Sequence, residues 1–201
     1  MSPQLSNTQL STSQVFFSIG FRPFFLGAAI YAVLSIGLWG SVYSLQMPFD
    51  ASPLGITQWH AHEMIYGYAM AVIAGFLLTA VSNWTGLPTS IGKPLALMFA
   101  CWCIARILYL VGPQLWLVAS LADLAFMAQL IAMISVPIIK RRLWARMAVV
   151  SKVVLLAAFN VAFVLGALGV LNNGIQIGIY GGLCLVVGLI LTIVKNLVPF
   201  F

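Results

Sequence analysis

Six long apolar stretches, separated by polar breaks, constrain this chain more than any other feature of its sequence. An apolar stretch of about 20 residues can cross the hydrocarbon core of a bilayer as a helix, and a helix satisfies its own backbone hydrogen bonds there. The sequence therefore predicts an all-α, polytopic bundle of six transmembrane helices in contact with the lipid bilayer. These helices are expected at residues 24–45, 60–81, 95–111, 115–139, 149–171 and 175–198.

The breaks and the composition support this division. Prolines, glycines and polar residues fill residues 46–58 and 82–94, as is typical of loops. Shorter breaks predict tight turns, so that spans three and four, and spans five and six, form hairpins. Only 6% of the residues are charged, against roughly 25% in a soluble domain. We expect a mobile polar tail over residues 1–15, followed by a single six-span domain over residues 16–201.

Lysine and arginine are confined to alternate loops. If the N-terminus is cytoplasmic, eight of the nine basic residues lie on the cytoplasmic side, and the three outer loops have none. The positive-inside rule then predicts that both termini are cytoplasmic. The net charge of +6 is thus a topology signal, and no nucleic-acid partner is expected. The eight residues are Arg22, Lys93, Lys140, Arg141, Arg142, Arg146, Lys152 and Lys195.

The remaining ionisable side chains gather near the predicted outer face. Both histidines of the chain, His60 and His62, and one of its three acidic residues, Glu63, lie together at the start of the second span. At 1.5 Å per residue, Arg106 lies about 8 Å below the outer end of span three, and Asp123 lies about 12 Å below that of span four. A cluster of polar groups in the outer half of the bundle is therefore expected.

Arg106 and Asp123 lie at similar depth on two spans joined by a tight turn. Charged groups inside a span rarely face lipid, which favours an ion pair that locks this hairpin. A second interpretation makes Arg106 a clamp for a cofactor carboxylate or an anion, with Asp123 orienting it. The two interpretations are compatible.

The histidines leave several alternatives open. Residues two apart on a helix point about 200° apart, so His60 and His62 cannot both bind one metal there, whereas His60 and Glu63 share a face. Both rings could face one way if the segment is extended at His60, or each could serve a different centre, one a haem and one a copper. Glu63 could then hold a histidine tautomer. Ordinary interfacial polar residues are the remaining interpretation.

A stripe of small residues continues below His60, with Gly67, Ala71 and Gly75 at helical spacing. Close helix packing explains such glycines, although a flat macrocycle could also lie in such a groove.

Three motifs resemble the NnrS family of bacterial membrane proteins: GFRPFFLGAAIYAVL, WHAHEMIYGYAMAVIAGFLLTAVSNWTG and the closing LTIVKNLVPFF. The resemblance implies a protein of the bacterial cytoplasmic (inner) membrane that contains haem and copper and acts in nitric oxide metabolism or nitrosative stress. It makes His60 and His62 the metal or haem ligand candidates. Arg106 and Asp123 fall where the family has a polar pair, and the candidate cofactor-binding residues are Glu63, Tyr66, Arg106 and Asp123. Nitric oxide is the expected small gaseous partner.

The chain departs from the family in two ways. It has half of the usual family length, so a missing C-terminal half, or a second copy in a homo-oligomer, would complete the bundle. In addition, Asn196 stands where the closing motif of the family has an arginine. The alternative to a metalloprotein is a metal-free transporter or structural subunit, in which the outer cluster of His, Glu, Arg and Asp is a substrate gate or an assembly contact.

Overall fold

The computed structural model describes residues 15–89 and 91–197, with side chains as far as Val194, and that part of the chain contains helices and no strands. Six helical segments are long and apolar enough to cross a membrane, which confirms the predicted all-α, six-span fold. The spans are α2 (Phe21–Leu45), α3 with η1 and α4 (Ile56–His62, Glu63–Ala69 and Met70–Thr85), α5 (Lys93–Val111), α6 (Trp116–Lys140), α7 (Met147–Ala167) and α8 (Gly174–Leu197).

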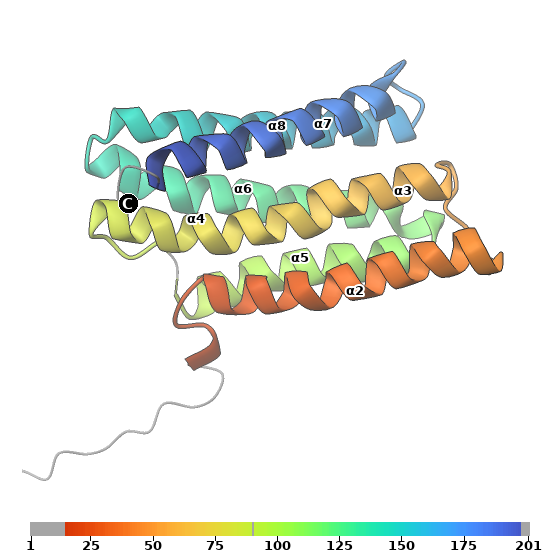
Figure 1. Cartoon of the computed structure of the whole chain (residues 1–201), viewed down its shortest axis with the longest axis horizontal. Helices are drawn as coiled ribbons and strands as arrows, with labels where there is room; N and C mark the ends of the chain where they lie inside the picture. The colour runs from red at the N-terminus through yellow and green to blue at the C-terminus, as the bar shows by residue number, and fades with distance from the viewer. Residues whose placement is uncertain (1–14, 90, 198–201) are drawn as a thin grey trace, which may run out of the picture.

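The spans lie side by side and alternate in direction (Figure 1). The tight turns produce the two predicted hairpins, because α5 packs on α6 and α7 packs on α8. The second span, which runs from α3 through η1 to α4, is the most buried of the six and contacts α2, α5, α6 and α8. The second span, which contains His60, His62 and Glu63, therefore lies at the centre of the bundle.

Helix ends follow the chemistry of the sequence. Gly86 ends α4 with a backbone φ of 64°, a left-handed conformation that glycine adopts without strain, and its N–H donates to the Ser82 carbonyl at 2.9 Å. Pro94 lies in the first turn of α5, where its missing N–H costs no hydrogen bond. These two signals place the break between the second and third spans.

Apart from Arg106, the Lys and Arg residues belong to the end of the bundle where α2, α5 and α7 begin and α4, α6 and α8 end; Figure 1 shows how these helix ends lie together. We call this the basic end. Two contacts tie it together: Arg141 Nε donates to the Thr85 carbonyl at 2.9 Å, and the Arg146 guanidinium lies 4.4 Å from the centre of the Trp84 ring. The loops at the opposite end, residues 46–55, 112–115 and 168–173, have no Lys or Arg. The side chain of Lys195 and the polar tail at residues 1–14 lie outside the described residues.

Candidate functional site

Five buried polar side chains form a closed ring in the half of the bundle away from the basic end. We call them the polar ring: His62, Glu63, Arg106, Asp123 and Asn160. They come from four spans, and none is more than 3% exposed. Because Arg106, Asp123 and Asn160 each lie about 8 to 11 Å from the near end of their own helix at 1.5 Å per residue, the ring occupies one level of the bundle.

Five contacts close the polar ring. The Arg106 guanidinium bridges two carboxylates, with Nη1 donating to Glu63 Oε2 at 2.8 Å and Nη2 donating to Asp123 Oδ1. Asn160 Nδ2 donates to Asp123 Oδ2 at 2.8 Å. The Asn160 amide oxygen lies 3.1 Å from His62 Nε2, and His62 Nδ1 lies 2.8 Å from Glu63 Oε1. The ion pair predicted between Arg106 and Asp123 is therefore present, and it belongs to a larger network.

Asn160 faces two different neighbours in the polar ring. Asp123 accepts from the Asn160 amide nitrogen, so the Asn160 amide oxygen faces His62 Nε2. The ring thus holds two carboxyl groups, a guanidinium and an imidazole side by side, and a buried charge needs such a partner.

Aromatic side chains enclose the charged part of the ring. The Tyr31 hydroxyl from α2 donates to Glu63 Oε2. The Arg106 guanidinium lies 6.0 Å from the centre of the Tyr31 ring and 5.3 Å from that of Tyr109, distances at which a cation interacts favourably with a ring face. These contacts tie α2 to the network.

The imidazole of His62 is also packed on its faces. The ring of Phe163 from α7 stacks on it, with centroids 4.4 Å apart and planes inclined by 27°. The rings of Tyr66 and Tyr109 lie 5.1 and 5.0 Å away. His62 is thus held by two hydrogen bonds and three aromatic neighbours.

The second span changes its helical winding at the polar ring. The π-helix η1 begins at Glu63 and ends at Ala69, and its wider turns alter which faces the following residues present, a feature often found at functional sites. Gly67 lies inside it and leaves room for the ring, since a Cβ there would lie 2.6 Å from Arg106 Nη1. Trp102 Nε1 donates to the Gly67 carbonyl at 3.0 Å, which fixes α5 against this segment.

His60 points away from the polar ring, toward α2. Its imidazole stacks on Trp39, with centroids 4.8 Å apart, and Trp39 stacks in turn on Tyr43. His60 Nδ1 is buried without a hydrogen-bond partner, while the residue as a whole is half-buried. Because α3 is helical through His62, the two rings diverge as helical geometry predicts, and the alternative of an extended segment at His60 is wrong.

The other candidates have structural partners. The Tyr66 hydroxyl donates to the Gly178 carbonyl of α8 at 2.6 Å. A Cβ on Gly75 would lie 3.0 Å from the Phe25 ring, so Gly67 and Gly75 of the small-residue stripe both serve close packing. Among the described residues, no group of three or more His, Cys, Asp or Glu side chains could hold a metal ion.

Sequence reasoning missed two members of the network. Asn160 is a polar residue in the middle of the fifth apolar stretch, and polar residues inside a span usually face the bundle interior, so this signal could have identified it. Tyr31 carries no such signal, because a tyrosine in an apolar helix is equally compatible with lipid contact.

The fold and the ring define a class: a polytopic helical membrane protein whose buried charges are bonded to one another. A family model described as NnrS protein matches residues 15–201, and the chain therefore belongs to the NnrS family. No curated protein and no solved structure matches the chain.

Proposed function

We propose that this chain is a haem- and/or copper-binding protein of the bacterial inner membrane that acts in nitric oxide metabolism or the nitrosative stress response. Membership in the NnrS family over residues 15–201 and six helices able to span a membrane support this proposal. The proposal of a bound cofactor depends on whether His60 or His62 has a ring nitrogen available to bind a metal. The two histidines differ in this availability.

His60 carries the proposal. Its Nδ1 is a buried nitrogen without a partner, and the stacked rings of Trp39 and Tyr43 give a flat apolar surface beside it. Haem brings its own four nitrogens and can take a single axial imidazole, which suits an isolated histidine. Copper sites usually recruit several protein donors, and the described residues offer no such group. The donor set therefore favours haem ahead of copper, and His60 would be the residue that holds it.

His62 does not fit the ligand role that the family resemblance implies. Both of its ring nitrogens lie at hydrogen-bond distance from partners in the polar ring, and a metal at either nitrogen would remove the contact with Glu63 or with Asn160. Arg106 likewise holds two carboxylates with its terminal nitrogens. In this proposal the polar ring positions the second span, and His60 alone meets the cofactor.

A bound haem would supply an iron able to bind a small gas such as nitric oxide. A cavity of about 230 Å³ between α2 and α5 is lined by apolar side chains such as Ile30, Leu34 and Ile107 together with Tyr31 and Arg106. His60 is not among its lining residues, so the support for a gaseous ligand comes from the family and not from this cavity.

Optical spectra of detergent-purified protein test the cofactor proposal. We expect a Soret band in the wild type after haem is supplied, a shift of that band on adding nitric oxide, and loss of the band in His60→Ala. Thr57→Ala is the matched control, because Thr57 is exposed and lies one turn before His60. A wild type without a Soret band, or a His60→Ala variant that keeps it, would overturn the proposal.

One observation favours the alternative of a metal-free transporter or structural subunit: the contacts that close the polar ring need no metal, although Arg106 Nε is buried without a hydrogen-bond partner. In that case the ring is an assembly lock or a substrate gate. The purified protein would be colourless in the presence of haem, and His60→Ala would fold and assemble like the wild type.

The orientation and assembly of the chain are also proposals. The basic side chains at one end support cytoplasmic termini by the positive-inside rule. Reporter fusions in the loop at Arg141–Arg142 test this, because export of the reporter would reverse the orientation. Native mass measurement in detergent tests the proposed homo-oligomer.

A further inference from the structure

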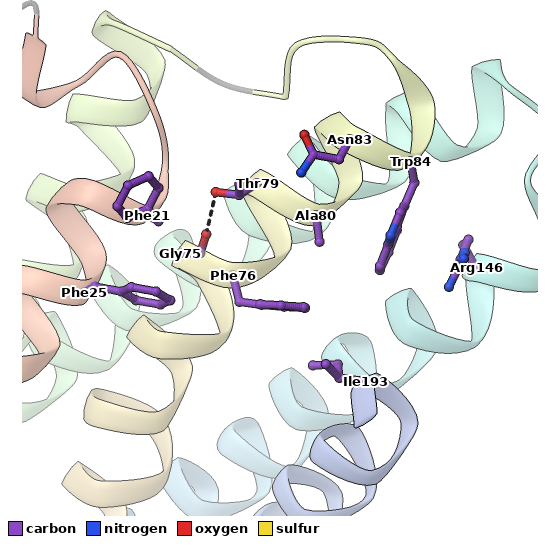
Figure 2. A pocket seen from close by; sticks show the side chains of 10 residues that line it. All are labelled: Phe21, Phe25, Gly75, Phe76, Thr79, Ala80, Asn83, Trp84, Arg146 and Ile193. Atoms are coloured by element: carbon purple, nitrogen blue, oxygen red, sulfur yellow. Dashed lines mark hydrogen bonds between the residues drawn. The ribbon is translucent and has the colours of Figure 1, made fainter. Parts of the chain in front are cut away.

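A groove of about 320 Å³ opens on the outside of the bundle near the basic end (Figure 2). Phe21 and Phe25 of α2 form one side, and Ile193 of α8 faces them. Phe76 and Trp84 of α4 lie across the back. The hydroxyl of Thr79, a further lining residue, already donates to the Gly75 carbonyl at 3.1 Å. The groove is therefore an apolar channel in the part of the bundle that contacts lipid.

One charged side chain lines this groove, and it has no anionic partner in the described part of the chain. The Arg146 guanidinium lies 4.4 Å from the centre of the Trp84 ring. The chain has three acidic side chains. Glu63 and Asp123 belong to the polar ring, and Asp50 lies in a loop at the opposite end. No acidic side chain of this chain is thus available to Arg146.

We propose that the groove binds an anionic phospholipid, with one acyl chain along the aromatic side chains and the headgroup phosphate on Arg146. Apolar contact alone would not hold a particular lipid, because the surrounding lipid tails are as apolar as the groove. The selectivity must come from charge, and a guanidinium is well suited to a phosphate because it can donate two parallel hydrogen bonds. That guanidinium packs on the face of Trp84, which lines the same groove.

Other cations of the basic end strengthen this match. Lys140, Arg141 and Arg142 precede Arg146 by a few residues, and each basic residue near the surface adds to the attraction for anionic lipid. They act at long range, however, and do not line the groove. The proposal therefore assigns the headgroup contact to Arg146 alone. A specific lipid site predicts that only Arg146 matters, whereas a general surface attraction predicts that every cation of the basic end contributes.

Native mass spectrometry with two lipids of identical acyl chains tests the proposal. Dioleoyl phosphatidylglycerol is anionic, and dioleoyl phosphatidylcholine is zwitterionic. We expect the wild type to retain the anionic lipid roughly fivefold better, about the contribution of one basic residue at the membrane surface. Arg146→Gln should remove most of this preference. Arg142→Gln is the matched control, because Arg142 is an exposed cation of the same loop that does not line the groove.

Two further measurements locate the lipid. Ala80 lines the groove, so Ala80→Trp should fill it and lower retention of both lipids. If that variant does not fold, brominated acyl chains provide the readout, because bromine close to Trp84 should quench its fluorescence in the wild type. Trp84→Phe should then show a smaller quenched fraction.

Three results would overturn the proposal. The first is an unchanged lipid preference in Arg146→Gln, and the second is an equally large loss in Arg142→Gln. The third is a dimer in the wild type that Ala80→Trp converts to monomer without any change in lipid retention, which would make a second copy the occupant of the groove. An absence of haem binding would leave the proposal intact, since it uses no residue near His60.

Discussion

The polar ring and the basic end differ in whether their charged side chains have charged partners. In the polar ring, two acids, a guanidinium and an imidazole are buried, and each is bonded to another member. At the basic end, cations such as Arg142 and Arg146 have no acidic side chain beside them. A charge removed from water needs a partner, whereas one at the interface keeps water and phosphate within reach. The buried charges of the polar ring therefore hold the helices together, whereas the cations of the basic end have no acidic partner in the described part of the chain.

The largest effect is expected from Arg106→Met. Removal of the guanidinium leaves Glu63 and Asp123 buried without a cation between them, and breaking a buried charge pair typically costs about 3–5 kcal/mol. We expect the free energy of unfolding in detergent to fall by that amount, or the protein to aggregate on purification.

The basic end supplies the control for this prediction. Arg142→Gln should change the free energy of unfolding by less than about 0.5 kcal/mol, as exposed substitutions usually do. Combining Arg106→Met with Asp123→Asn removes one charge of each sign and should recover part of the loss. Similar stabilities of Arg106→Met and Arg142→Gln would show that the two ends do not differ in this way.

A smaller effect on stability is expected from replacing the two histidines, and it should differ between them. His62→Gln removes an imidazole that bonds to both Glu63 and Asn160, and leaving buried polar groups unpaired costs about 1–3 kcal/mol. In the protein purified without haem, His60→Gln removes a stacking contact with Trp39, worth roughly 0.5–1.5 kcal/mol. Thermal unfolding in detergent should therefore show the larger loss for His62→Gln. The reverse order would mean that His62 is not a structural member of the ring.

A third prediction concerns the π-helix. Gly67→Ala places a Cβ 2.6 Å from Arg106 Nη1 and 3.0 Å from Tyr31 Cε1, so the guanidinium must shift away from Glu63. Such overpacking typically costs about 1–3 kcal/mol. Gly37→Ala in α2 is the matched control, because a Cβ there would meet nothing within 4 Å. Equal unfolding midpoints for the two variants would show that Gly67 does not set the position of Arg106.

The fold could be predicted from the sequence because few kinds of backbone structure can cross a membrane. Lipid demands long apolar helices, and the tight turns at Gly112 and Asn172–Asn173 leave hairpins as the natural result. The ion pair between Arg106 and Asp123 was predictable for the same reason, since depth along two helices of a hairpin is fixed by counting residues.

The rest of the site depends on rotation about the helix axes, which residue counting does not provide. Glu63 meets Arg106 across 43 positions of sequence, and the π-helix that begins at Glu63 shifts the faces of the second span. Asn160 joins the ring only because α7 turns that face toward Asp123. For the same reason the sequence could not show that Glu63 and Asn160 lie at hydrogen-bond distance from the two ring nitrogens of His62. The ligand role that the family resemblance implies for His62 stays a prediction.

The smallest effect is expected at Asp50, the acidic residue in the loop before α3. It is fully exposed, and the Ser52 N–H donates to its Oδ1 at 2.9 Å. Hydrogen bonds from Ser52 lower the pKa of Asp50 below its usual value. A carboxyl group with a lowered pKa in the folded state stabilises the protein above its unfolded pKa, and this contribution disappears as the pH falls through the folded pKa. Asp50→Asn should therefore unfold slightly earlier than the wild type at pH 7, and the two melting curves should converge as the pH falls below the ordinary Asp pKa of about 3.9 and through the lowered pKa of the folded state. Because Asp50 keeps its water while Glu63 and Asp123 have lost theirs, a shift here as large as that of Arg106→Met would contradict burial as the cause of the difference between exposed and buried charges.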